Sequence, residues 1–143
     1  MTIINPYLAF NGNAEEAFEY YKSVFGGKFT ALQRCKDAPD SDKMLASERE
    51  KILHISLPIG QGNVLMASDD LGKMGQNFTV GTNFPLSLHP ESQEEADRLF
   101  NGLSASGQAT IPMHKAYWGA YFGMLTDKFG VQWMVSYDYN GQK

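Results

Sequence analysis

The sequence predicts a single α+β domain made of two βαβββ modules, each with one helix and four strands. One strand-like run precedes each of two amphipathic helical segments, and three strand-like runs follow each of them. The triplet Glu-Glu-Ala recurs in the two helical segments, at positions 15–17 and 94–96, which indicates an internal repeat. We therefore expect one domain over residues 1–143, with a first module at 1–70, a connector at 71–82 and a second module at 83–140.

The first module opens with a strand and a helix. The apolar run Ile3–Phe10 ends at Asn11-Gly12-Asn13 and predicts a strand that enters a turn. Asn13 is a good helix N-cap, and Glu16 stands three residues later, as in a capping box. Apolar residues then recur at helical spacing until Gly26-Gly27, where the helix is expected to end.

Three further strands complete the first module. They are expected at 29–35, 51–59 and 63–68, and Gly60-Gln61-Gly62 joins the last two in a tight hairpin. The segment Lys36–Glu50 contains Pro39 and five acidic residues. It is interpreted as an exposed loop.

The second module repeats this order. A strand at 83–89 precedes a helix that begins after Ser92, with Glu95 in the capping-box position, and that ends at Gly107. Strands follow at 108–114, 120–126 and 131–138, and the turn at 127–130 separates the last two. Because one helix shields only one face of such a sheet, the modules must share a core or pair with another chain, within one subunit or by exchange between subunits. The remaining faces are expected to form a concave sheet, which is a natural place for a ligand pocket.

Composition and charge exclude several classes of function. The net charge of −4 and the scattered positions of the 12 basic residues argue against nucleic acid or an anionic membrane as a partner. No stretch reaches the roughly 18 apolar residues that a membrane span requires, and the N-terminus lacks the pattern of a signal peptide. Cys35 is the only cysteine, so it forms no internal disulfide and belongs to no metal or redox motif. We expect a cytoplasmic protein.

Four stretches carry a resemblance to a known family. They are PYLAFNGNAEEAFEYYKSVFGG, HISLPIG, NVLMASDD and YWGAYFGMLTDKFGVQWMVSYD. Together they resemble the PhnB-like branch of the vicinal oxygen chelate superfamily, which contains glyoxalase I, extradiol dioxygenases and bleomycin-resistance proteins. The resemblance covers nearly the whole chain. It implies the glyoxalase/bleomycin-resistance fold, in which paired βαβββ modules form a curved mixed sheet with a concave cup, and it implies a homodimer.

The same resemblance implies a place for a divalent metal, but the residues found there do not suit one. In catalytic members the ligands are His, Gln or Glu on the first and last strands of each module. Alignment on the helix starts places Pro6 and Pro85 at the first-strand positions. The last strands offer Met134 in the second module and Met66 and Ser68 in the first. Proline has no donor and a thioether is a poor ligand for hard or borderline ions, so we expect no metal and predict no cofactor.

Members of this branch are often labelled as ubiquinone-precursor methyltransferases. The sequence gives that label no support, because no GxGxxG-like segment precedes a helix, as it does in parallel-sheet proteins that bind adenosine-containing methyl donors.

Three histidines are candidate acid-base residues. His54 lies in the middle of a predicted strand, and it is either a general base or ligand anchor facing the cup or a hydrogen-bonded sheet residue. His89 precedes Pro90, which favours a strand-end or capping position, and His114 lies near a loop at the mouth of the cup. No HxH, HxxxH or HxxE pairing links them, so only convergence in space would make a non-standard metal site.

An aromatic group near the C-terminus supplies candidate ligand contacts. Trp118 and Phe122 are predicted as pocket walls that stack on a flat or apolar ligand, on condition that the strand begins early enough to hold both. Met66 and Met134 are predicted to form an adaptable apolar floor, and Ser68, beside Asp69, is a candidate polar contact at the rim. The predicted ligand-binding residues are therefore His54, Met66, Ser68, Trp118, Phe122 and Met134.

These observations leave three functions open. The leading hypothesis is a metal-free homodimer that binds a small molecule in an aromatic and methionine-lined cup. The alternative is an enzyme of the same superfamily, a lyase or isomerase that uses an atypical metal set including His54 or acid-base chemistry alone. The third is an interaction module that acts through exposed strand edges. Fold class does not decide among them, and neither ligand nor reaction is named by the sequence.

Overall fold

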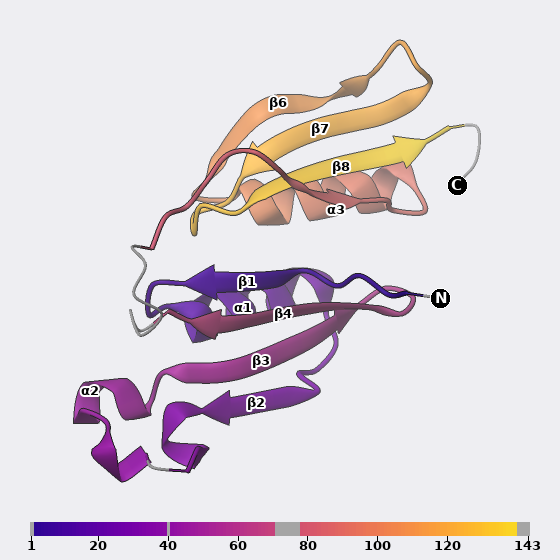
Figure 1. Cartoon of the computed structure of the whole chain (residues 1–143). Coiled ribbons are helices and arrows are strands. Elements are labelled where there is room, and N and C mark those ends of the chain that lie inside the picture. Colours follow the sequence, from indigo (N-terminus) through magenta and orange to yellow (C-terminus); the bar gives the residue numbers. More distant parts are fainter. Residues whose placement is uncertain (1, 40, 71–77, 140–143) are drawn as a thin grey trace. The chain divides into compact units, whose positions relative to one another are not determined.

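The computed structural model of the chain describes residues 2–39, 41–70 and 78–139 (Figure 1). The chain divides into two compact units, Met1–Phe78 and Thr79–Lys143. Each unit contains one four-stranded sheet. Most of the predicted connector, residues 71–77, lies outside the described residues, as does residue 140 at the predicted end of the second module.

The first unit has the order β-α-β-β-β, with short helical turns between its second and third strands. Its sheet has the strand order β1-β4-β3-β2. β1 is parallel to β4, and the other two pairs are antiparallel. The elements are β1 (Tyr7–Phe10), α1 (Ala14–Phe25), β2 (Ala31–Arg34), η1 (Cys35–Asp37), η2 (Ser41–Lys43), α2 (Ala46–Arg49), β3 (Ile52–Ile59) and β4 (Asn63–Asp69).

The second unit repeats the topology of the first. Its sheet has the order β5-β8-β7-β6, with β5 parallel to β8 and the other pairs antiparallel. The elements are β5 (Leu86–Leu88), α3 (Gln93–Ser104), β6 (Gln108–Lys115), β7 (Ala120–Thr126) and β8 (Gln132–Asp138). The predicted α+β fold is therefore confirmed, and β7 has the bounds that the sequence predicted.

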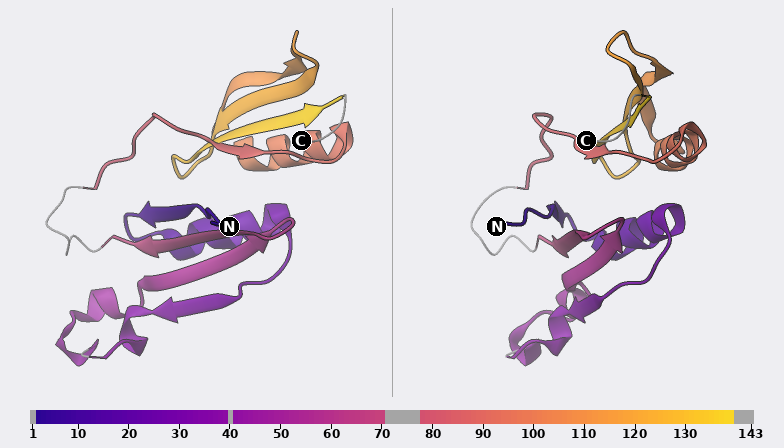
Figure 2. Two further views of the ribbon diagram at one scale, coloured as in Figure 1. Left: turned by 45° about the vertical axis from the view of Figure 1, so that its right-hand side comes forward. Right: turned by 90° about the vertical axis from the view of Figure 1, so that its right-hand side faces the viewer.

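The helix of each unit packs on one face of its own sheet (Figure 2). In the first unit, Phe18 and Tyr21 of α1 are fully buried, and Phe18 meets Phe10 of β1 edge to face with ring centroids 6.2 Å apart. In the second unit, the buried residues of α3 and of the sheet beneath it include Leu99, Phe100, Leu103, Leu125, Trp133 and Val135. Within the described residues of each unit, no helix of that unit lies on the opposite face of its own sheet, which we call the open face of that unit. None of the described helices is long and apolar enough to cross a membrane.

The first strand of each unit is shorter than predicted. β1 begins at Tyr7, whereas a strand was expected over Ile3–Phe10. Ile3 and Ile4 are 77% and 87% exposed, so burial does not hold them in a sheet. Pro6 has no N–H to donate, although its carbonyl still accepts a hydrogen bond from Met66 N at 3.1 Å. β5 covers only three residues of the predicted 83–89.

A buried carboxylate caps α1 in place of Asn13. The side chain of Asn13 makes no capping hydrogen bond, so the predicted capping box with Glu16 is wrong. Instead Asp69, at the end of β4, accepts hydrogen bonds from Ala14 N at 2.9 Å and from Ile52 N at 2.8 Å. A carboxylate in this place also complements the positive end of the helix dipole. One side chain therefore ties the start of the helix to two strands.

The start of α3 agrees with the prediction, and its end does not. Ser92 Oγ accepts a hydrogen bond from Glu95 N at 3.0 Å, and the Glu95 carboxylate accepts one from Glu91 N at 2.8 Å. Gly107 was expected to close the helix, but α3 ends at Ser104. Ser106, with φ of 62°, takes the left-handed conformation that glycine usually supplies after a helix.

The segment Lys36–Glu50, predicted as an exposed loop, contains the short turns η1, η2 and α2. Arg34 connects this segment to α1. Its guanidinium donates to both carboxylate oxygens of Glu15, at 2.9 and 2.7 Å, and to the carbonyl of Glu50 at 3.0 Å. The side-chain hydrogen bond from Arg34, aided by its positive charge, holds the pKa of Glu15 below its usual range.

Glu15→Gln is expected to lower the free energy of unfolding by about 0.5–1 kcal/mol at pH 7, the upper part of the range for exposed ion pairs, because the pairing is bidentate. Since the pKa of Glu15 is lower in the folded state, the ionised group stabilises the fold above its unfolded-state pKa of about 4.3. This contribution is lost as the pH falls through the folded-state pKa. Urea unfolding of both proteins at pH 7 and in acid measures the difference.

Glu19→Gln is the matched control for this prediction. Glu19 lies on the same helix and reaches Lys22 only at 3.9 Å, with both side chains well exposed. Equal losses of stability in the Glu15 and Glu19 variants at pH 7 would contradict the role given to the Arg34 pair.

Candidate functional site

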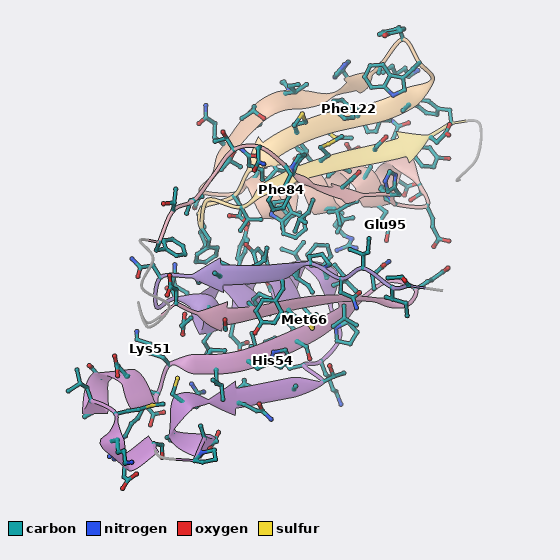
Figure 3. The ribbon with its side chains drawn as sticks, viewed as in Figure 1. Lys51, His54, Met66, Phe84, Glu95 and Phe122 are labelled. Carbon is teal, nitrogen blue, oxygen red and sulfur yellow. The ribbon has the colours of Figure 1, made fainter. Side chains whose placement is uncertain are left out.

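The open face of the first unit carries polar side chains in the middle of the sheet. On β4, Ala67 is buried on the helix side, so its neighbours Met66 and Ser68 point to the open face. His54 of β3 lies on that face too, because the adjacent Ile55 pairs with Ala67. Figure 3 shows His54 and Met66 on these two neighbouring strands. Three of the predicted ligand-binding residues therefore share one face of one sheet.

Tyr7 joins this face from β1, and the sequence analysis did not select it. It pairs in register with Met66. Its hydroxyl oxygen lies 3.3 Å from His54 Nδ1, and the two ring centroids are 5.7 Å apart. Because β4 lies between β1 and β3 in the sheet, the two side chains meet above β4. The signal in the sequence was the alternation of side chains between the two faces of a strand, which places Tyr7 and Ala9 on the face opposite to Phe10. In the structure Tyr7 and Ala9 are exposed while Phe10 is buried.

Met134 has the same place in the second unit that Met66 has in the first. Each lies on the last strand and pairs with one residue of the first strand and one of the third strand of its unit. Ser136 follows two residues later, as Ser68 follows Met66. A Met-x-Ser triplet therefore occurs twice, at 66–68 and 134–136, and this repeat was the signal that could have identified Ser136.

Phe122 of β7 takes the place of His54 in the second unit. It pairs with Ser136, whereas His54 stands opposite Ser68, next to the Ile55–Ala67 pair. The corresponding position is therefore an imidazole in the first unit and a phenyl ring in the second. Figure 3 shows Phe122 on β7. The two open faces have the same backbone plan and different chemistry.

Trp118 contacts Phe122 from a turn and not from a strand. β7 begins at Ala120, as predicted, so the condition that the strand begin early enough to hold Trp118 is not met. The Trp118 ring nevertheless lies 5.4 Å from the Phe122 ring, and the His114 ring lies 6.1 Å from it on centroid distances. Trp118 is 54% exposed, and its neighbour Tyr117 is 97% exposed. We call Trp118, Phe122 and His114 the aromatic cluster, and its exposed rings are suited to stacking on a planar ligand.

His89 and His114 also make local hydrogen bonds. His89 Nε2 lies 3.0 Å from Ser87 Oγ, directly after β5, which is the strand-end position predicted for it. His114 Nδ1 donates to the carbonyl of Pro112 at 3.0 Å. Because Nδ1 is bonded to the backbone of the same strand, Nε2 is the ring nitrogen of His114 that points away from that backbone.

The divalent metal of the superfamily does not fit the residues on the open faces. On the first and last strands, these faces carry Tyr7, Met66, Ser87 and Met134. A phenol, an alcohol and two thioethers are not a donor set for a hard or borderline cation. Pro6 and Pro85, expected at the first-strand positions, lie one residue before β1 and β5. Among residues 2–39, 41–70 and 78–139, no group of three or more His, Cys, Asp and Glu side chains is placed to hold a metal ion.

Two buried carboxylates belong to the scaffold. Asp69, expected beside Ser68 at the rim, is buried and bonded to the backbone as described above. In the second unit, Asp127 is 3% exposed. Its oxygens accept hydrogen bonds from Phe129 N at 2.8 Å, Val131 N at 3.0 Å and Trp133 Nε1 at 2.9 Å. The carboxylate of Asp69 is therefore occupied by backbone donors of its own unit.

Tyr121 is a further titratable group with a defined environment. Its hydroxyl donates to Asp97 Oδ1 of α3 at 2.7 Å, and this hydrogen bond, with partial burial, raises the pKa of Tyr121. Because the partner is on the helix, Tyr121 lies on the covered side of the sheet, away from the open face.

Comparison with known proteins finds relatives along nearly the whole chain. The family model described as 3-demethylubiquinone-9 3-methyltransferase matches residues 2–136. Protein YjdN of Escherichia coli (strain K12) is 31% identical over 141 residues, covering 93% of each protein.

Solved structures show the same likeness. Protein PA1353 from Pseudomonas aeruginosa is 38% identical, with a TM-score of 0.84 over 96% of this chain and 98% of that one. A Bacillus cereus protein described as a putative 3-demethylubiquinone-9 3-methyltransferase, PhnB protein, is 26% identical, with a TM-score of 0.75 over 95% and 99%. A glyoxalase-related enzyme from Fulvimarina pelagi is 17% identical, with a TM-score of 0.65 over 96% and 89%, and shares the fold.

Proposed function

Because this chain belongs to the PhnB-like branch of the glyoxalase/bleomycin-resistance superfamily, described as the 3-demethylubiquinone-9 3-methyltransferase family, we propose that it binds a small molecule on the open faces of its sheets. The proposed binding needs neither the superfamily's usual metal nor another cofactor. The observation that carries the proposal is the aromatic cluster, in which Trp118 and His114 pack around Phe122 on an uncovered sheet face.

The chemistry of this face suits a planar and partly apolar ligand. The rings of Trp118 and Phe122 stand at 69° to each other, so they can meet a flat ligand by face and by edge. Met124 and Met134 pair beside them on β7 and β8, and thioether side chains adapt to ligands of different outline. His114 and Ser136 add hydrogen-bonding groups at the edge of this apolar surface.

The proposal does not include methyl transfer. Adenosine-containing methyl donors are usually bound by a Gly-rich turn between a parallel strand and a helix. Here only three residues, Asn11-Gly12-Asn13, separate β1 from α1, and three of the four strands in each unit run in antiparallel pairs with their neighbours. Lys51 Nζ donates to the carbonyl of Gly12 at 3.0 Å, which fills the inner side of that turn with a side chain of the protein.

We further propose a cytoplasmic homodimer. A cytoplasmic setting is supported by the chain's single cysteine, Cys35, which is buried and forms no disulfide. A homodimer is supported by family membership and by the open faces, which the helix of their own unit does not cover. The net charge of −4 disfavours nucleic acid and anionic membranes as partners.

Binding is tested by thermal unfolding with planar probes, namely 4-hydroxybenzoate, 1-naphthol and menadione. At least one probe is expected to raise the melting temperature, because a ligand of the folded state stabilises it. The same probe is expected to change the fluorescence of Trp118, a change that is lost in Trp118→Phe. Phe122→Ala is expected to weaken binding about tenfold or more, the effect of about 1.4 kcal/mol.

Leu45→Ala is the control for this experiment. Leu45 is 68% exposed and precedes α2 in the first unit, so the variant removes an exposed apolar side chain that is not part of the aromatic cluster. A probe that binds wild-type and Phe122→Ala equally well would contradict the proposed site. Absence of any shift with all three probes would contradict the proposed function.

The second candidate function is an enzyme of the same superfamily, a lyase or isomerase. The donor set of the open faces disfavours the metal-dependent form of this hypothesis. The contact between Tyr7 and His54 favours the acid-base form.

A further inference from the structure

We propose that Tyr7 and His54 form a proton-relay pair that tautomerises a small 2-oxo acid bound on the open face of the first unit. The inference rests on the proposed function, because it gives a substrate class and a reaction to one of the two proposed binding faces. It depends on side chains other than the aromatic cluster.

The pair is placed where a ligand on this face must meet it. Tyr7 comes from β1 and His54 from β3, and their polar atoms approach to 3.3 Å above the strand that separates them. Met66 and Ser68 of that strand lie beneath. Tyr7 is 52% exposed and His54 is partly exposed, so both polar groups remain accessible from the open side.

The hydrogen bond gives the pair two alternative proton arrangements. When His54 Nδ1 carries the hydrogen and donates to the Tyr7 hydroxyl, Nε2 has a free lone pair and the phenolic hydrogen points to the ligand. When Tyr7 donates to Nδ1, Nε2 carries the hydrogen. The two arrangements differ only in proton positions, and neither requires a net charge on the pair.

Passage from the first arrangement to the second removes a proton from one atom of the substrate and delivers a proton to another. Nε2 takes the hydrogen from the carbon next to the carbonyl, so that a C–H bond breaks and an N–H bond forms. Nδ1 passes its hydrogen to the Tyr7 oxygen, and the phenolic hydrogen goes to the carbonyl oxygen of the substrate. The C–H electron pair becomes the carbon-carbon double bond, and the product is the enol. No oxidant, metal or cofactor is needed, and the reverse passage restores the first arrangement.

Neighbouring polar groups favour an oxygen-rich substrate. Gln33 of β2 pairs in register with His54, and Ser68 stands on its other side on β4. An amide N–H and a hydroxyl can each donate to a carboxylate, which would hold the substrate while its carbonyl meets Tyr7. Ser56, the next open-face residue of β3, is 5% exposed and bonds to Thr30 Oγ1 at 2.8 Å, so it forms part of the floor and not of the contact surface.

The test is hydrogen-deuterium exchange at the 3-carbon of pyruvate and of phenylpyruvate in heavy water, followed by proton NMR with the full chain. Wild-type protein is expected to accelerate exchange of at least one of them tenfold or more over buffer, within the range that general acid-base groups contribute. His54→Gln is expected to return the rate to that of buffer, and Tyr7→Phe to lower it at least tenfold. His89→Gln removes an exposed histidine outside this face and is expected to leave the rate unchanged.

Two further measurements distinguish a catalytic role of these side chains from a structural one. Melting temperatures of both variants show whether each remains folded, and nitrogen-15 NMR of the His54 ring is expected to show a changed ratio of its two neutral tautomers in Tyr7→Phe. Wild-type exchange no faster than buffer, or exchange that persists in His54→Gln, would overturn the relay. If planar probes still raise the melting temperature in that case, the proposed binding function stands without it; if they do not, both proposals fail.

Discussion

Asp127→Ala is expected to lower the free energy of unfolding by about 3–4 kcal/mol. The Asp127 carboxylate is 3% exposed and accepts three hydrogen bonds, two from backbone N–H groups and one from the indole of the fully buried Trp133. Hydrogen bonds to a charged group contribute about 1.5–3 kcal/mol each, and groups that share one acceptor do not add fully. Loss of the acceptor therefore affects both the β7–β8 turn and the largest buried side chain of the second unit.

Urea unfolding followed by circular dichroism measures this loss. Asp127→Asn keeps one acceptor oxygen and is expected to lose less stability than Asp127→Ala. Asp42→Ala is the control, since it removes a carboxylate of the same kind from an exposed position and is expected to change stability by less than about 0.5 kcal/mol. Similar losses in the Asp127 and Asp42 alanine variants would show that the hydrogen bonds of Asp127 contribute no more to the free energy of unfolding than an exposed carboxylate does.

Gly107→Ala is expected to be the other strongly destabilising change, by about 2–4 kcal/mol or loss of the folded second unit. A methyl group at this position would collide with the Thr126 carbonyl and lie 2.9 Å from the backbone carbon atoms of Asp127. These are backbone atoms of the strand end and turn, so no side chain can rotate away to make room. Gly107 N also donates to the carbonyl of Ser104 at 2.8 Å, which fixes its place after α3. Overpacking of this kind forces the backbone to move.

Gly81→Ala is the matched control in the same unit. A methyl group there meets only the side-chain oxygen of Asn83, at an ordinary distance of 3.8 Å, and the residue has no positive φ. The substitution is expected to be neutral or to stabilise by up to about 1 kcal/mol, because alanine restricts the unfolded chain. If thermal melts show the same shift for both variants, the close approach at Gly107 does not constrain the fold.

The elements of the fold were predictable because their signals are local. The two long helices, α1 and α3, were identified from apolar spacing, and the β7 bounds follow from the turn residues that flank the strand. The helix caps show the limit of this reasoning. Asn13 has the right chemistry for an N-cap, but Asp69, distant in sequence, supplies a charged acceptor to the same end of the helix. A long-range partner of this kind leaves no pattern near Asn13.

The candidate site was predictable in part for the same reason. Met66 and Met134 were selected separately, and the structure gives them corresponding places because the strand order of the two units is the same. Tyr7 was missed because its contact with His54 depends on β1 lying beside β4, a pairing between the first and last strands of the unit. Trp118 was expected beside Phe122 only on condition that the strand began early, whereas its place there comes from the turn that precedes β7.

The parallel pairing of first and last strands also determines when each unit can form during synthesis. β1 leaves the ribosome first, yet among the described strands its neighbour in the sheet is β4, which ends at Asp69. The Asp69 carboxylate that caps α1 arrives at the same late moment. Until then the nascent chain holds a helix without its cap and a strand without its neighbour, and loop closure over this span slows their joining. We therefore expect each unit to fold as a whole after its last strand has emerged, and the first unit to begin while the second is still being translated.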